Sequence, residues 1–132
     1  MADFRCDSPA PVGVARLDEQ HRRSHELVSA LVQALRTDPG DAGAEERFVE
    51  LFQDTVLHFK AEEDFLEGKG YPDLIPHRFE HELLLDWFRE QLAHRNAPEP
   101  RPLLEVVTEL ADLLRQHREK VDQAYATWLA SR

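Results

Sequence analysis

Seven residues of this chain combine metal-binding side chains with positions that belong on the inner faces of helices. Imidazole and carboxylate groups placed among apolar side chains lose their hydration, so their burial is unfavourable unless something bonds to them. Metal ions do this, since neutral imidazole and ionised carboxylate are common metal ligands. The residues are His21, His58, Glu62, His77, His81, His117 and Asp122. Together they predict a metal site inside a helical domain.

Two pairs among them have the spacing of about one helical turn. His58 and Glu62 are four residues apart, as are His77 and His81. Each pair therefore presents two ligand atoms on one side of its helix. A single pair of this kind is a weak signal, because most are solvated hydrogen-bonded pairs or satisfied core residues. The same pattern on several helices favours metal binding over those alternatives.

His117 and Asp122 are five residues apart. On an α-helix this spacing separates two side chains by about 140° around the axis. We therefore expect the histidine to bind one metal ion and the carboxylate to reach across to a second. His21 adds a ligand from a further helix.

The ligand types narrow the choice of metal. Cysteine is absent from the set, which argues against structural zinc and iron–sulfur sites. Imidazoles with bridging carboxylates suit a pair of iron ions, with manganese and zinc as alternatives. If Glu62, Asp122 and a solvent-derived oxygen bridge two octahedral ions, one coordination position stays open, and dioxygen is the ligand we expect there. The paired Glu-x-x-His motifs of carboxylate-rich oxidases are not visible, which favours oxygen binding over oxygen activation.

Four amphipathic stretches separated by short breaks must position these residues. Apolar residues recur every three or four positions in each stretch, and prolines and glycines lie between them. We predict helices from Val14 to just before Asp38, from residues 42–44 to the stop at Gly68 and Gly70, from residues 73–75 to just before Asn96, and from Leu103 to the end. The expected fold is all-α: an up-down-up-down antiparallel four-helix bundle over residues 14–132, preceded by an N-terminal arm of residues 1–13.

Several other residues of these helices have simpler expected roles. Phe65 and Tyr125 continue apolar faces and are expected in the core. Glu63 and Asp18 are expected to support ligands or cap helices rather than bind metal. His94 lies near the end of the third predicted helix, where a solvent-exposed histidine is favourable.

Composition and charge limit the partners. The chain has 132 residues and a net charge of −10, which argues against binding to nucleic acid or to anionic membranes. No apolar run is long enough to span a membrane, and the first residues lack the pattern of a secretory signal. Cys6 is the single cysteine, which excludes an internal disulfide; we expect no role for its thiol. These features predict a cytoplasmic protein.

Four stretches of the sequence resemble the hemerythrin family, and in particular its single-domain bacterial form. They are VGVARLDEQH (12–21), HFKAEE (58–63), YPDLIPHRFEH (71–81) and HREKVD (117–122). They occur in order, extend over nearly the whole chain and fill all seven ligand positions of the family. The resemblance implies a nonheme diiron centre with an oxo or hydroxo bridge. It also implies a protein that binds dioxygen for carriage, storage or sensing and is not an enzyme.

The resemblance implies a division of the ligands between the two iron ions. One iron would be held by His77, His81 and His117, the other by His21 and His58, with Glu62 and Asp122 as bridges. The open coordination position would belong to the iron held by two histidines.

The resemblance also places five residues around the oxygen pocket. Phe59 and Leu114 are typical of the family, whereas Arg118, Ser24 and His25 stand where apolar residues are usual. Polar groups there could admit water or donate protons, which would promote loss of bound oxygen. Two other roles remain open for His25, as a hydrogen-bonding neighbour of the ligands or as an additional iron ligand. Arg118 could instead reach solvent or pair with a carboxylate.

Two classes of function are compatible with these residues. The first is a binding protein that carries, stores or senses dioxygen, with nitric oxide as a further candidate ligand. The second is a diiron redox enzyme or sensor that consumes or responds to oxygen, peroxide or nitric oxide. The complete histidine-rich ligand set favours the first, and the polar pocket residues alone favour the second. A sensor would need a separate protein partner.

Overall fold

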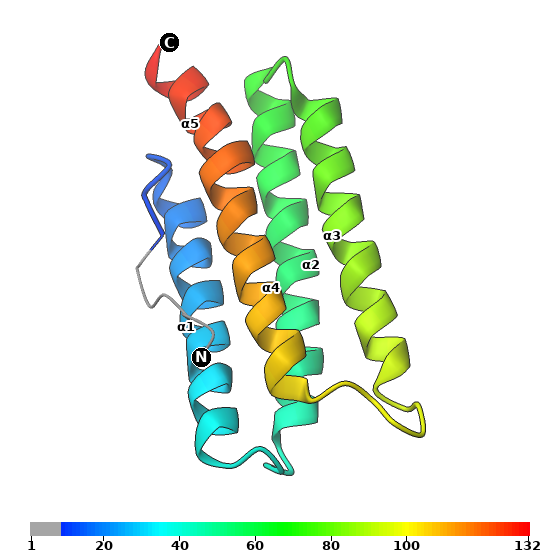
Figure 1. Cartoon of the computed structure of the whole chain (residues 1–132). Coiled ribbons are helices and arrows are strands. Elements are labelled where there is room, and N and C mark those ends of the chain that lie inside the picture. The colour runs from blue at the N-terminus through cyan, green and yellow to red at the C-terminus, as the bar shows by residue number, and fades with distance from the viewer. Residues whose placement is uncertain (1–8) are drawn as a thin grey trace.

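The computed structural model describes residues 9–132, so Cys6 lies outside the described part of the chain. Four long helices form the bundle: α1 (Ala15–Thr37), α2 (Ala44–Lys69), α3 (Leu74–His94) and α4 (Leu103–His117). A turn of π-helix, η1 (Arg118–Asp122), then joins α4 to α5 (Gln123–Ala130). Figure 1 shows neighbouring helices running in opposite directions, with α4, η1 and α5 forming one continuous rod. The predicted all-α antiparallel bundle is confirmed.

Glycine ends α2 where the sequence predicts a stop. Gly70 adopts the left-handed conformation with φ of 73°, which favours glycine because it has no Cβ. Its N–H donates to the carbonyl of Glu67, and the N–H of Tyr71 donates to that of Leu66 at 3.0 Å. These bonds satisfy the last carbonyls of the helix and turn Tyr71 into the bundle. Within residues 9–132, no helix is long and apolar enough to cross a membrane.

The described part of the N-terminal arm packs against the bundle. Val12 is buried, and its N–H donates to Asp18 Oδ1 at 2.7 Å. The Gln123 side chain donates to the carbonyls of Ala10 and Pro11. Asp18 therefore organises the entry into α1, as expected, and the arm connects α1 to α5.

The bundle interior is divided into three layers along its length. The largest is the apolar core, formed by Val28, Leu31, Val32, Leu35, Ala44, Phe48, Leu51, Phe59, Leu85, Phe88, Leu103, Val106, Val107, Leu110 and Leu114. A smaller apolar cluster consists of Val12, Leu17, Leu66, Tyr71 and Tyr125. Along the chain, the predicted ligands of each segment fall between residues of these two groups. They make a polar layer with apolar packing on both sides.

The inner face of α2 differs from the prediction at two neighbouring residues. Phe65 is only half-buried at the edge of the small cluster, whereas Leu66 is fully buried. Leu66 lies four residues after Glu62 and so extends the same inner stripe. His94 is exposed, as predicted.

Candidate metal centre

Glu62 lies at the middle of the polar layer. Its side chain is completely buried, and each of its two oxygens faces a different pair of histidines. Oε1 is 2.9 Å from His77 Nε2 and 3.0 Å from His81 Nε2. Oε2 is 3.2 Å from His21 Nε2 and 3.6 Å from His58 Nε2. One carboxylate thus joins ligands from three helices.

Asp122 makes a second connection across the layer. Its Oδ1 lies 3.2 Å from His117 Nε2 and 3.6 Å from His77 Nε2. Its Oδ2 lies 3.2 Å from His21 Nε2. Asp122 and Glu62 therefore both extend between the same two sets of histidines, which is the arrangement of bridging carboxylates.

The π-helical turn η1 explains how Asp122 reaches this position. In a π-helix the backbone hydrogen bonds join residues five apart, so residues at this spacing lie about one turn apart on the same side. His117 directly precedes this turn, Asp122 is its last residue, and their side chains face each other. The expected separation of about 140° is wrong for this reason. The ordinary helical spacing rules gave no sign of the extra residue in the turn.

The seven side chains form two overlapping groups. Glu62, His77, His81, His117 and Asp122 each offer a ligand atom within 4.8 Å of the others and are called here the three-histidine group. His21, His58 and Glu62 do the same and form the two-histidine group. Glu62 is common to both. The histidines fall into the same two sets as in the resemblance, while Asp122 belongs to the three-histidine group and also lies 3.2 Å from His21.

The pKa shifts in the polar layer show that its buried carboxylates are stabilised by positive charge. Burial alone would raise the pKa of Glu62, but its contacts with the histidines keep that pKa well below its ordinary value. Burial would lower the pKa of His21, but contacts with Asp122 and Glu62 outweigh it and raise the pKa to about 9. Burial lowers the pKa of His58 to about 4. Two ionised carboxylates in an apolar interior need nearby cations, which metal ions would provide.

Several buried atoms of the layer have no hydrogen-bond partner in the described structure. Both carboxylate oxygens of Asp122 and Nε2 of His117 are in this state. Buried polar atoms are rarely left without partners. These atoms point at their neighbours across distances that a metal ion could bridge, and they are the donor types that iron accepts. The residues present therefore fit a metal pair.

Comparison with known proteins agrees with this geometry. The sequence model of the family described as the hemerythrin HHE cation-binding domain matches residues 12–129. The chain belongs to the hemerythrin family. It is 32% identical to a bacteriohemerythrin of Ralstonia nicotianae, over 92% of this chain and 85% of that protein. It is 33% identical to a bacteriohemerythrin of Stenotrophomonas maltophilia, over 87% and 74% of the two chains.

A third relative matches a smaller part of the chain. A hemerythrin-like protein of Naegleria gruberi is 35% identical over 60% of each chain. No solved structure matches the chain. Hemerythrin membership makes this a cation-binding domain, and it agrees with the expectation of a protein that is not an enzyme.

In this hemerythrin, three described residues outside the predicted ligand set form hydrogen bonds with the ligands. Glu63 accepts a hydrogen bond from His81 Nδ1 at 2.7 Å, which confirms its expected supporting role. Gln20 Oε1 lies 2.7 Å from His58 Nδ1 and was not predicted. Its position directly before a ligand histidine is the one sequence signal that could have suggested it.

Tyr125 is the third such residue. It is completely buried in the small apolar cluster, as expected of a core residue. Its hydroxyl also donates a hydrogen bond to Glu62 Oε2 at 2.7 Å. Burial, together with the nearby carboxylates, raises the pKa of Tyr125, so the phenol stays protonated and keeps donating. An apolar face alone could not predict this contact.

The apolar residues of the expected oxygen pocket lie against the ligands. The ring of Phe59 stacks on His81 with centroids 3.8 Å apart and planes 3° apart. Phe59 also contacts the rings of His58 and His117. Leu114 is buried in the apolar core one turn before His117. These contacts keep one side of the layer dry.

The three polar residues differ from one another in their relation to the layer. Arg118 is half-buried, and burial lowers its pKa while the Asp122 charge opposes that effect. Ser24 is buried and His25 is half-buried. Among residues 9–132, no hydrogen bond or ion pair connects Ser24 or His25 to any of the seven ligands. Of the three, Arg118 therefore has the clearest electrostatic connection to the site.

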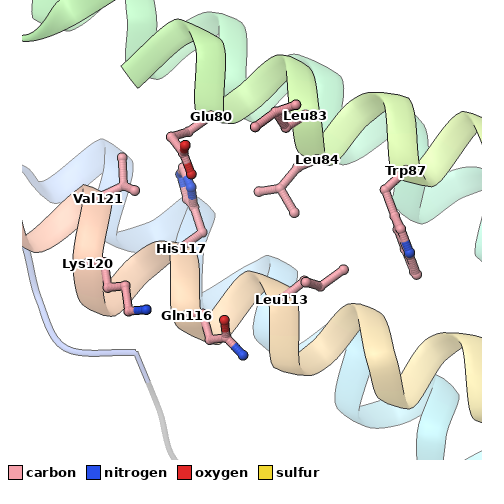
Figure 2. Close-up of a pocket in the computed structure, with 9 residues that line it drawn as sticks. All are labelled: Glu80, Leu83, Leu84, Trp87, Leu113, Gln116, His117, Lys120 and Val121. Carbon is pink, nitrogen blue, oxygen red and sulfur yellow. The ribbon is translucent and has the colours of Figure 1, made fainter. Parts of the chain in front are cut away.

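A pocket of about 280 Å³ lies at the surface between α3 and α4 (Figure 2). Its walls are Glu80, Leu83, Leu84, Trp87, Leu113, Gln116, His117, Lys120 and Val121. His117 is the member of the polar layer that lines it, and Glu80 and Lys120 on its rim are exposed. The pocket thus connects solvent with the three-histidine group, on the side away from the two-histidine group.

Proposed function

We propose that this chain is a nonheme diiron protein that binds dioxygen and carries, stores or senses it. His77, His81 and His117 would hold one iron, and His21 and His58 the other. Glu62 and Asp122 would bridge the pair, together with an oxo or hydroxo group. The observation that carries the proposal is the shared position of Glu62 between two buried groups of histidines.

The charges of the polar layer support two ions rather than one. In both Glu62 and Asp122, one carboxylate oxygen faces the three-histidine group and the other faces His21. A single ion could not satisfy both oxygens of Glu62 and both of Asp122, since the oxygens face opposite ways. Two iron ions in these positions would supply an open coordination position and the electrons for reversible dioxygen binding.

The surroundings support binding in preference to turnover. The histidines outnumber the carboxylates, and Phe59 and Leu114 cover the layer with apolar surface. An apolar cover excludes the water and acids that would displace a bound ligand. The relatives named bacteriohemerythrin match nearly all of the helical bundle, which supports the same function here.

One observation favours the second candidate function, a redox enzyme or a sensor of oxygen, peroxide or nitric oxide. Arg118 is half-buried within electrostatic reach of Asp122, and its guanidinium can donate hydrogen bonds. Such a group could promote release of a bound oxygen species. A sensor would also require a protein partner. In either case we propose a cytoplasmic location, in keeping with the single cysteine.

The deciding experiment is an anaerobic one. The protein is loaded with ferrous iron, the iron per chain is counted, and the visible spectrum is recorded after adding air and after removing oxygen. Two irons per chain and a charge-transfer band that appears and then disappears would support reversible binding. Immediate formation of a stable ferric spectrum would favour the enzyme or sensor. Failure to retain iron would contradict both.

A further inference from the structure

The two histidines that have hydrogen-bonded Nδ1 atoms have different partners. His81, in the three-histidine group, contacts the Glu63 carboxylate at 2.7 Å. His58, in the two-histidine group, contacts the Gln20 side-chain oxygen at the same distance. Both partners are acceptors, so each ring donates from Nδ1 and keeps Nε2 free for a metal. The geometry of the two contacts is alike, but their charges differ.

Glu63, the partner of His81, also forms an ion pair with an arginine, which favours its charged form. Arg78 Nε donates to Glu63 Oε1 at 3.3 Å, while Glu63 Oε2 accepts from His81. A hydrogen bond to an ionised acceptor is roughly twice as strong as one to a neutral acceptor. The hydrogen bond from His81 to the charged Glu63 draws the Nδ1 proton away from the ring, and this makes Nε2 a stronger electron donor. Gln20 is neutral and has a much weaker effect of this kind on His58.

The other three histidines do not offset this difference. Nδ1 of His21, His77 and His117 has no hydrogen-bond partner in the described part of the chain. Among residues 9–132, the single charged acceptor at a ligand Nδ1 therefore lies on the three-histidine side. A stronger donor stabilises ferric over ferrous iron, because the ferric ion has the higher charge.

We propose that Glu63 and Gln20 make the two iron positions electronically unequal, so that the iron beside His81 is oxidised first. The inference rests on the proposed diiron function. Treated with an outer-sphere one-electron oxidant, the ferrous pair would lose its first electron from the three-histidine position. The second electron would leave the two-histidine position, where Gln20 gives less support to the ferric state. Glu63 and Gln20 are thus positioning residues that act through the ligand histidines.

Exchange of carboxylate and amide tests the inference with little change in shape. Glu63→Gln removes the charge beside His81 but keeps an acceptor, and Gln20→Glu adds a charge beside His58. The midpoint potentials of the iron-loaded protein are measured by anaerobic titration with ferricyanide, and Mössbauer spectra of the half-oxidised state show which iron is ferric. We expect Glu63→Gln to raise the first potential and Gln20→Glu to lower the second. The double variant should reverse the order of oxidation.

A matched control separates this local effect from a change in overall charge. Glu67 is the other carboxylate near Arg78, at 3.6 Å, but it contacts no ligand histidine among the described residues. Glu67→Gln removes the same charge and should leave both potentials unchanged. Loss of the Glu63 charge in Glu63→Gln should also weaken metal binding, by up to about 10- to 100-fold, whereas Glu67→Gln should not.

The possible results distinguish this inference from the proposed function. Unchanged potentials in iron-loaded Glu63→Gln and Gln20→Glu would overturn the inference and leave the diiron function intact. Equal shifts in Glu67→Gln would overturn it as well. If wild-type protein does not retain two irons, the proposed function itself fails. Should Glu63→Gln lose its iron, Gln20→Glu alone decides, because it adds a donor without removing one.

Discussion

The apolar core and the polar layer occupy the same bundle interior, yet they contribute to it in opposite ways. Phe48 and Phe88 of the core are almost completely buried and pack with ring centroids 4.9 Å apart. Each such side chain contributes about 1.5–3 kcal/mol through burial. Glu62 and Asp122 are just as buried, but their charges oppose folding unless cations are near. The bundle is therefore stabilised in one layer and prepared for binding in the other.

The apolar core and the small apolar cluster hold the polar layer in place from both sides. The apolar core holds all four long helices together at one end, and the small cluster joins the arm, α1, α2 and α5 at the other. The ligands lie between them on helices that cannot easily move apart. Ligands held on rigid elements in this way are already arranged for the metal before it binds.

Removal of a ligand should have the largest effect and should be confined to the polar layer. Asp122→Ala or His58→Ala should abolish iron retention and the oxygen-dependent colour, because each removes contacts that no other residue replaces. Helix content measured by circular dichroism should remain, since the apolar core is unchanged. His94→Ala, at an exposed position, is the control and should keep both iron and colour. Full iron content in either ligand variant would contradict the site assignment.

A large truncation in the apolar core should instead lower the stability of the fold. Phe88→Ala should lower the free energy of unfolding by about 3–5 kcal/mol, because it leaves a cavity beside Phe48 and Phe52. Chemical denaturation of the metal-free protein measures this. Phe79→Ala, where the side chain is 61% exposed, should change stability by no more than about 0.5 kcal/mol. Similar losses in the two variants would show that the core does not carry the stability.

Tyr125 packs in the small apolar cluster and also donates a hydrogen bond to Glu62 in the polar layer, so removing its hydroxyl measures what this contact contributes. Tyr125→Phe keeps the packing but removes the hydrogen bond to Glu62, and it should destabilise the metal-free protein by about 1.5–3 kcal/mol. Tyr71→Phe is the matched control, because the Tyr71 hydroxyl makes no hydrogen bond within the described residues. If thermal unfolding gives the same midpoint for both variants, the contact with Glu62 contributes nothing to folding.

The smallest effect is expected at the edge of the polar layer. Arg118→Ile should slow the conversion of the oxygenated protein to the ferric form by a few-fold, since it removes a charged hydrogen-bond donor that interacts electrostatically with Asp122. The decay of the visible band in air measures the rate. Arg115→Ile, which removes an arginine paired with Asp112 and Glu119 instead, should leave that rate unchanged. An unchanged rate in Arg118→Ile would remove this residue from the oxygen-pocket argument.

Much of the fold and of the site could be predicted because it depends on local periodicity. Apolar residues at three- and four-residue intervals predicted the four helices, and Gly70 predicted the end of α2. The four-residue spacing of His58 and Glu62 predicted that they share a helix face. These properties follow from the geometry of a single α-helix, which is the same wherever the helix lies.

Other features depend on contacts between helices and could not be obtained in this way. Gln20 on α1 reaches His58 on α2, and Tyr125 on α5 reaches Glu62 on α2. Neither partner is near in sequence, and neither residue type is diagnostic of a metal site. The resemblance placed Ser24 and His25 in the oxygen pocket, but no hydrogen bond or ion pair joins them to the ligands in residues 9–132.

The sequence by itself determined which side chains could bind metal and that helices would carry them, because residue type and helical period are local properties. The tertiary structure decided how those side chains meet. The π-turn that follows His117 and ends at Asp122 directs the second carboxylate into the polar layer, where it meets His117 and His21 from different helices. The tertiary structure also placed a charged acceptor behind one histidine and a neutral acceptor behind another. Such choices depend on the surroundings of each side chain, and those exist only once the bundle has formed.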